Sequence, residues 1–121
     1  MLAAMNQDTR LAKLLVESGA NINAKDHAGN TAVMLAAEAG QAETVLLLAS
    51  NGANLDEQND EGQTALMKAV TTGSLGCVDA LLRLGADVTL KDHEGETVLT
   101  MARGSGNSEI RERFESSGMQ K

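Results

Sequence analysis

The side chains of this 121-residue chain that could do chemistry are two histidines, one cysteine and several neighbouring carboxylates. Paired carboxylates such as Asp60 and Glu61 could act as general acid and base if burial shifted their pKa values. A cysteine could act as a nucleophile if a histidine lay beside it as its base. Whether these groups can react depends on the elements that position them, so the organisation of the chain has to be read first.

The chain repeats itself every 33 residues. Gly29, Gly62 and Gly95 keep this interval, and each is followed two residues later by a threonine. The other positions that keep the same step are Ala36, Ala69 and Ala102; Gly40, Gly73 and Gly106; Gly19, Gly52, Gly85 and Gly118; and Leu15, Leu48, Leu81 and Phe114. A fixed period of this length indicates a repeat array, in which each unit packs against its neighbours.

Two segments resemble the consensus of a known family. Residues 62–70 read Gly-Gln-Thr-Ala-Leu-Met-Lys-Ala-Val and resemble the ankyrin signature G-x-T-P-L-H-x-A-A. Residues 81–88 read Leu-Leu-Arg-Leu-Gly-Ala-Asp-Val and match L-L-x-x-G-A-D-V. The chain is therefore identified as a member of the ankyrin repeat family. The resemblance implies an all-α solenoid of stacked helix-turn-helix units joined by β-hairpin-like loops.

The repeats divide the chain into about three and a half units within one domain, 1–121. We expect a partial repeat over 1–25, full repeats over 26–58 and 59–91, and a C-terminal capping repeat over 92–121. The first helices should start after Thr31, Thr64 and Thr97, because a threonine hydroxyl can accept from an N–H of the first turn. The second helices are expected over 41–51, 74–84 and 107–117, each closed by a glycine that suits a left-handed cap.

The repeats depart from the signature at two positions. The signature proline is replaced by Ala32, Ala65 and Val98, and the signature histidine by Met34, Met67 and Thr100. The family's usual hydrogen bond between the threonine and the histidine therefore lacks its histidine. We expect the two methionines to fill the core, because a thioether adapts to irregular gaps. The rest of the expected core consists of small residues from the first helices, Ala36, Ala37 and Ala69, and larger ones from the second helices, Val45, Leu48, Val78, Leu81 and Leu82.

The two ends of the array differ. Where a preceding repeat would stack, the partial first repeat offers the apolar residues Leu2, Leu11, Leu14 and Leu15. In the last repeat, polar Arg111, Arg113 and Glu115 stand where earlier second helices are apolar, which is typical of a cap. We expect either a piece of a longer array or a small protein with a covering partner. The isolated chain should be a monomer or associate through its uncapped N-terminal face.

This organisation argues against catalysis. His27 and His93 occupy the same loop position two repeats apart, so they cannot share a metal ion. Cys77 falls in a second helix near the core with no histidine in phase, so we expect a buried, unreactive thiol. The carboxylates lie on exposed loops, where nothing excludes water. We expect no enzyme activity, no metal site and no cofactor.

The composition limits the classes of binding partner and the cellular compartment that can be expected. Seventeen acidic and ten basic side chains give a net charge of −7, which disfavours nucleic acid and anionic membranes. No stretch approaches the roughly 20 apolar residues of a membrane helix. A single cysteine cannot form an internal disulfide, so we expect a cytoplasmic or nuclear protein.

The resemblance implies a binding surface made of loop tips and the exposed ends of the first helices, on the concave side. Carried onto this sequence, its residues are His27, Ala28, Asn30, Glu38, Ala39, Asp60, Glu61, Gln63, Thr71, Thr72, His93, Glu94, Glu96 and Ser105. The basic residues that flank them are Lys25, Lys68, Lys91 and Arg103. Because negative charge predominates, we expect a partner protein, either a folded surface or a peptide, with a moderate preference for a basic segment.

Two further interpretations stay open. The chain could be a structural spacer within a larger ankyrin protein, with no specific ligand of its own. Asn23 lies in a G-A-x-x-N-A loop that resembles the sites asparaginyl hydroxylases modify in ankyrin domains, whereas Asp56 and Thr89 break this pattern in later repeats.

Overall fold

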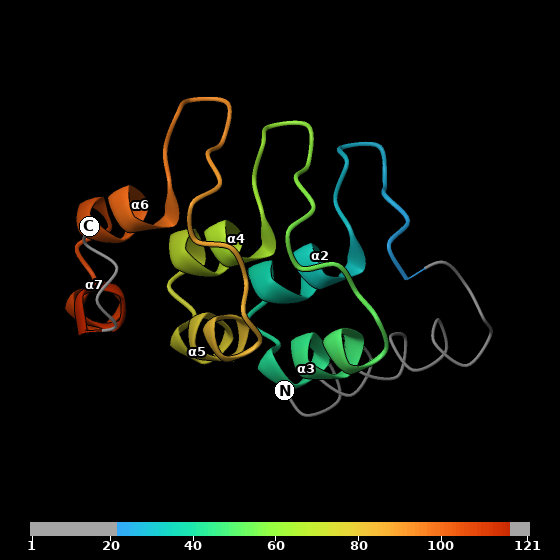
Figure 1. The fold of residues 1–121 in the computed structure, drawn as a ribbon, viewed down its shortest axis with the longest axis horizontal. Coiled ribbons are helices and arrows are strands. Elements are labelled where there is room, and N and C mark those ends of the chain that lie inside the picture. The colour runs from blue at the N-terminus through green and yellow to red at the C-terminus, as the bar shows by residue number, and fades with distance from the viewer. Residues whose placement is uncertain (1–21, 117–121) are drawn as a thin grey trace.

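The chain forms a row of helix pairs joined by projecting loops (Figure 1). The computed structural model describes residues 22–116, with side chains up to residue 114. Its helices are α2 (Ala32–Glu38), α3 (Ala42–Ser50), α4 (Ala65–Thr72), α5 (Leu75–Arg83), α6 (Val98–Gly104) and α7 (Ser108–Ser116). Within these residues the regular elements are all helices, and the predicted all-α solenoid is confirmed.

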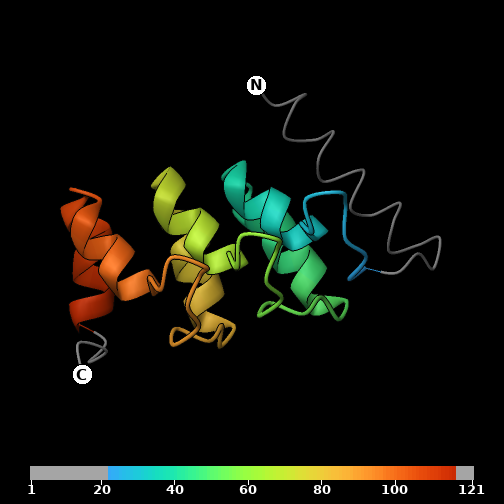
Figure 2. The same ribbon diagram turned by 90° about the horizontal axis from the view of Figure 1, so that it is seen from above.

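The helices form two rows. The first helices of each pair, α2, α4 and α6, contact one another in sequence, and so do the second helices, α3, α5 and α7. The loops before α2, α4 and α6 stand side by side and project from the first row (Figure 1), and the same succession is seen from above (Figure 2). Each side chain on a loop tip is therefore placed by the helix pair beneath it.

Each first helix starts at the predicted threonine. Thr64 has an extended backbone, and its Oγ1 accepts from the Met67 N–H at 3.2 Å. In return, the Thr64 N–H donates to Met67 Sδ at 3.4 Å. The same reciprocal pairs are Thr31 with Met34 and Thr97 with Thr100. The replacement of the signature histidine therefore did not abolish the hydrogen bond, because a thioether sulfur or a hydroxyl oxygen accepts in its place.

The core lies between the two rows and has the expected division of sizes. The first helices bury small Ala36, Ala37 and Ala69, which lets neighbouring helices approach closely. The second helices bury Val45, Leu48, Val78 and Leu81, and Phe114 fills the same role at the end of the array. Leu82, expected with this group, is only half-buried. Met34 and Met67 are buried as predicted, so each both packs and accepts a hydrogen bond.

The ends of the second helices follow the prediction within the described residues. Gly52 and Gly85 have φ angles of 96° and 85°, which is the left-handed conformation expected after a helix. Gly118 lies outside the described residues. So do the four leucines of the partial first repeat, and with them the N-terminal face that was expected to be uncapped.

The last helix is polar on its outer side, although one arginine does not point outward. Arg111 on α7 is exposed, as a cap requires. Arg113 is only half-exposed, and its Nε donates to Asp79 Oδ1 on α5 at 2.7 Å. This ion pair with its hydrogen bond raises the pKa of Arg113. Arg113 therefore joins α7 to the preceding repeat, and Glu115 has no described side chain.

Candidate partner-binding surface

Each loop tip is closed by one polar side chain at its base. Asn59 Oδ1 accepts from the Glu61 N–H at 2.9 Å and the Gln63 N–H at 2.8 Å. A backbone bond from the Asn59 N–H to the Gln63 carbonyl, at 3.0 Å, completes the hairpin. Asp26 and Asp92 make the same pair of side-chain bonds in the other two loops. These three residues were not among those predicted for the site, although an Asp or Asn at a 33-residue step is a recognisable turn signal.

Neighbouring hairpins are bonded to each other along their backbones. The Asp60 N–H donates to the Ala28 carbonyl at 3.0 Å, and the His93 N–H donates to the Glu61 carbonyl at 3.0 Å. Gln58 adds a side-chain link, because its Nε2 donates to the Lys91 carbonyl at 2.8 Å. The tips therefore form one continuous edge whose spacing is fixed by the repeat.

A second set of bonds joins the feet of the hairpins. Asn23 Oδ1 accepts from the Asn54 N–H at 2.7 Å, and Asp56 Oδ1 accepts from the Asp87 N–H at 2.8 Å. Asn23 is half-buried, so the amide that resembles a hydroxylation site is part of a seam between repeats.

The seams are tight at the inner glycines. Gly62 has a φ of 81°, and a Cβ added there would lie 2.8 Å from the His93 backbone nitrogen and 2.9 Å from the Asp92 Cα. Gly95, at the same φ, has nothing within 4 Å. Gly62 is thus required both for the turn and for the approach of the next hairpin, whereas Gly95 is required only for the turn.

We call the hairpin tips together with the exposed side of α2, α4 and α6 the candidate face. Of the fourteen residues predicted to bind a partner, twelve are exposed and two are half-buried. The two are Asn30 and Gln63, whose side-chain oxygens accept from Asn59 Nδ2 at 2.9 and 3.2 Å. The bond to Asn30 joins the first hairpin to the second, and the bond to Gln63 lies within the second hairpin, so both amides take part in internal hydrogen bonds.

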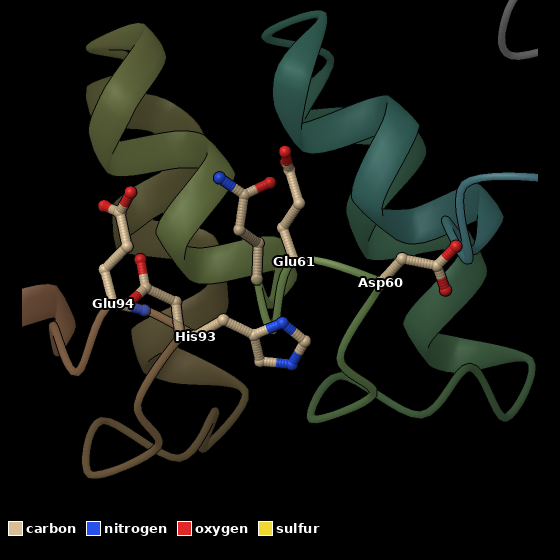
Figure 3. A pocket seen from close by; sticks show the side chains of 6 residues that line it. Asp60, Glu61, His93 and Glu94 are labelled. Atoms are coloured by element: carbon tan, nitrogen blue, oxygen red, sulfur yellow. The ribbon is translucent and has the colours of Figure 1, made fainter.

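A cleft of about 210 Å³ separates the second and third tips. It is lined by Asp60, Glu61, Gln63, Asp92, His93 and Glu94. The His93 ring points toward the second hairpin, and the side chains of Glu61 and Glu94 both extend above it in this view (Figure 3). Asp60 lies against the preceding hairpin beside Gly29. The cleft therefore presents carboxylates around one exposed imidazole.

Two of the basic side chains near the face form internal ion pairs. Lys25 Nζ lies 3.1 Å from Glu57 Oε1, and Lys68 Nζ lies 3.3 Å from Glu38 Oε1. Glu38 was predicted as a contact residue, and its charge is compensated in this way. Among the residues that the structure describes, the tip carboxylates Asp60, Glu61, Glu94 and Glu96 form no ion pair. The face keeps a net negative charge at its second and third hairpins.

The other chemical candidates are placed as follows. Cys77 is buried in α5, and burial raises the pKa of its thiol, which keeps it protonated and unreactive. His27 and His93 are both exposed on their tips. Within residues 22–116, no three His, Cys, Asp or Glu side chains gather as they would around a metal ion.

The stacked helix pairs, the bonded hairpins and the exposed polar tips define a repeat protein of the solenoid class. A family model described as ankyrin repeats, in three copies, matches residues 1–92. The chain belongs to the ankyrin repeat family. No curated protein matches it. Ankyrin repeats are generally protein–protein interaction modules and are typically non-enzymatic. None of the described helices is long and apolar enough to cross a membrane.

Proposed function

We propose that the chain binds a partner protein through the candidate face, with a moderate preference for a basic segment. The observation that carries this proposal is the set of tip carboxylates without an internal counter-ion. A carboxylate that already has an internal counter-ion gains little from a second cation. An unpaired carboxylate gains a favourable interaction when a cationic group of a partner approaches. The rigid hairpin edge supports the proposal further, because fixed contact groups lose little entropy on binding.

The first step of the test is to identify the partner. The purified chain, tagged at its C-terminus, serves as bait for affinity capture and mass spectrometry from the native cell, and each captured protein is then purified. Calorimetry or fluorescence anisotropy then gives its Kd over a range of salt concentrations. Because screening weakens exposed charge interactions, we expect the affinity to fall as salt rises. An affinity that does not depend on salt would contradict the basic preference.

Charge-reversal variants then locate the surface. We expect Glu61→Lys combined with Glu94→Lys to weaken binding by about tenfold or more while circular dichroism shows an unchanged fold. Glu43→Lys is the matched control, because Glu43 is an exposed carboxylate on α3, in the other row of helices. If the control weakens binding and the double variant does not, the site lies on the second helices. A purified chain that captures no partner unless flanking domains are present would favour the spacer interpretation.

Asn23 remains a predicted hydroxylation site. Its amide oxygen is engaged by Asn54, so modification requires this seam to open. Mass spectrometry of protein from its native cell would show one added oxygen on the peptide that contains Asn23. A peptide found only in the unmodified form would contradict the prediction.

We further propose that the protein works in the cytoplasm or the nucleus. The single, buried thiol supports a reducing compartment, because such a protein needs no disulfide for its stability. Imaging of the full-length, tagged protein tests this, and accumulation in the secretory pathway would contradict it.

A further inference from the structure

We propose that the candidate face takes its partner segment in one direction, with an apolar side chain against α2 and basic side chains over the second and third hairpins. This inference rests on the proposed function and adds the chemistry and the polarity of the partner. It follows from two gradients that run along the array, one in the hairpins and one in the first helices.

The hairpins carry the first gradient. At the first tip Asp26, His27 and Ala28 are exposed, and the carboxylate of Asp26 is the only acidic group among them. Asp26 Oδ1 accepts from the Ala28 and Asn30 N–H groups at 2.9 and 2.8 Å, so this carboxylate is already hydrogen-bonded within its own turn.

The next two hairpins bear the unpaired carboxylates. The second tip has Asp60 and Glu61, and the third has Glu94 and Glu96. The position that closes the turn is the neutral Asn59 in the second hairpin, so neither of its exposed carboxylates is engaged in closing the turn. Negative charge therefore rises from the first hairpin to the second and the third.

The second gradient is in the exposed apolar surface of the first helices, which is largest at α2. Leu35 on α2 is 46% exposed, and exposed Ala39 follows one turn later. The position equivalent to Leu35 is Lys68 on α4, which is half-buried and paired with Glu38. Because that pair also neutralises the acid on α2, the surface beside Leu35 has no uncompensated charge from Glu38.

The position of Leu35 belongs to the candidate face. Its equivalent on α6 is Met101, which lines a groove of about 420 Å³ together with Thr71, Ser105 and Glu96. Thr71 and Ser105 are predicted contact residues, and Glu96 places a carboxylate at the same groove. A segment that runs along the first helices therefore meets leucine at one end and a mostly polar groove with the carboxylate of Glu96 at the other.

The complementary occupant is a peptide segment with an aliphatic side chain at one end and arginine or lysine at the other. Burial of Leu35 favours the aliphatic end at α2. The carboxylates of the later hairpins attract the basic end and would repel an acidic one. In the reversed direction, cationic groups would be desolvated beside a leucine, and the carboxylates would face apolar groups.

The test uses the full chain and one synthetic peptide with a leucine-rich half and an arginine-rich half. A photo-crosslinking residue is placed at the arginine end in one version and at the leucine end in the other. We expect mass spectrometry to map the arginine-end label to residues 84–105 and the leucine-end label to α2. Labels from both ends spread equally over both regions would overturn the direction.

Variants provide a second measurement with matched controls. We expect Leu35→Ala to weaken peptide binding by about fivefold, whereas Leu46→Ala on α3, where Leu46 is 45% exposed, leaves it unchanged. Glu94→Gln with Glu96→Gln should weaken binding and flatten its salt dependence, and Glu109→Gln on α7 should do neither. Equal effects of Leu35→Ala and Leu46→Ala would overturn the apolar contact.

The two proposals can fail separately. If the natural partner's affinity depends on Glu61 and Glu94 but neither peptide label shows a direction, the polarity is wrong and the proposed function stands. If Glu61→Lys and Glu94→Lys leave the affinity of the natural partner unchanged, the proposed function itself is wrong.

Discussion

The paired helices and the hairpins that they carry are stabilised by different forces. The helices bury alanine, leucine, valine and methionine between two rows, so their stability comes from apolar packing. The hairpins bury few apolar side chains and are held by hydrogen bonds within each turn and across each seam. The comparison shows how the array separates two tasks. Packing fixes where each tip stands, and the exposed tip side chains take no part in that packing.

The largest expected effect comes from the helix rows. Leu66 on α4 is fully buried, and Leu66→Ala leaves a cavity in the central repeat. We expect the free energy of unfolding to fall by about 3 kcal/mol, measured by urea denaturation followed by circular dichroism. Leu84→Ala is the control, because Leu84 is 40% exposed and its truncation leaves no internal cavity. Equal losses in the two variants would remove the distinction between packed and exposed leucines.

The next effect tests the tightest seam. Gly62→Ala places a Cβ against the backbone of the next hairpin, and Gly95→Ala places one in open space at the same φ. We expect about 1 kcal/mol of destabilisation for Gly95→Ala from the left-handed backbone alone, and about 2 kcal/mol or more for Gly62→Ala. Thermal and urea unfolding measure both. Similar values would mean that the hairpins separate at little cost.

A third variant isolates hairpin closure. Asn59→Ala deprives the Glu61 and Gln63 N–H groups of their acceptor, and we expect a loss of about 1–2 kcal/mol. Asn59→Asp keeps the acceptor, as Asp26 and Asp92 do, but removes the amide donor to Asn30, so its loss should be smaller. Amide hydrogen exchange of Glu61 and Gln63 provides the local measurement. Unchanged protection in the alanine variant would contradict this role.

A smaller effect tests the sulfur acceptor at the helix start. Met67→Leu keeps the volume of the buried side chain and removes the acceptor for the Thr64 N–H, so we expect a loss of about 0.5–1 kcal/mol. Met101→Leu is the control, because Met101 on α6 is half-buried and lies outside the helix-start position. If both substitutions cost the same, the sulfur contributes only packing.

The smallest effect is a pH dependence confined to the hairpins. The backbone N–H of Asn30, followed by that of Ala28, holds the pKa of Asp26 below its ordinary value of 3.8. A lowered folded-state pKa stabilises the fold above the unfolded-state pKa, and this contribution is lost as the pH falls through the folded-state value. NMR titration of the Asp26 carboxyl measures the pKa directly. Asp26→Asn should keep the turn, as Asn59 does, and abolish this part of the acid sensitivity.

The helices could be predicted from the sequence because their signals are local and periodic. Thr31, Thr64 and Thr97 are caps in the structure, and the expected core positions of the second helices are buried apart from Leu82. These features depend on contacts within a few residues or on a pattern that every repeat shares. The 33-residue repeat is therefore sufficient to predict where the helices start and which of their positions form the core.

The details of the surface could not be predicted in the same way. The ion pair of Lys68 with Glu38 and that of Arg113 with Asp79 join side chains from different repeats. Their formation depends on how long side chains reach across a seam, which spacing alone does not determine. The methionine acceptors were missed for another reason, since sulfur is a weak acceptor and its packing role is the commoner one.

The hydrogen bonds that join neighbouring hairpins also bear on how the chain is made. The side-chain bonds across the seams join residues 29 to 34 positions apart, for example Asn59 with Asn30 and Arg113 with Asp79. The described helices likewise contact their own pair and the adjacent pair. Each unit therefore finds its partners once the next 33 or so residues have emerged from the ribosome, and folding can proceed by stepwise addition during synthesis.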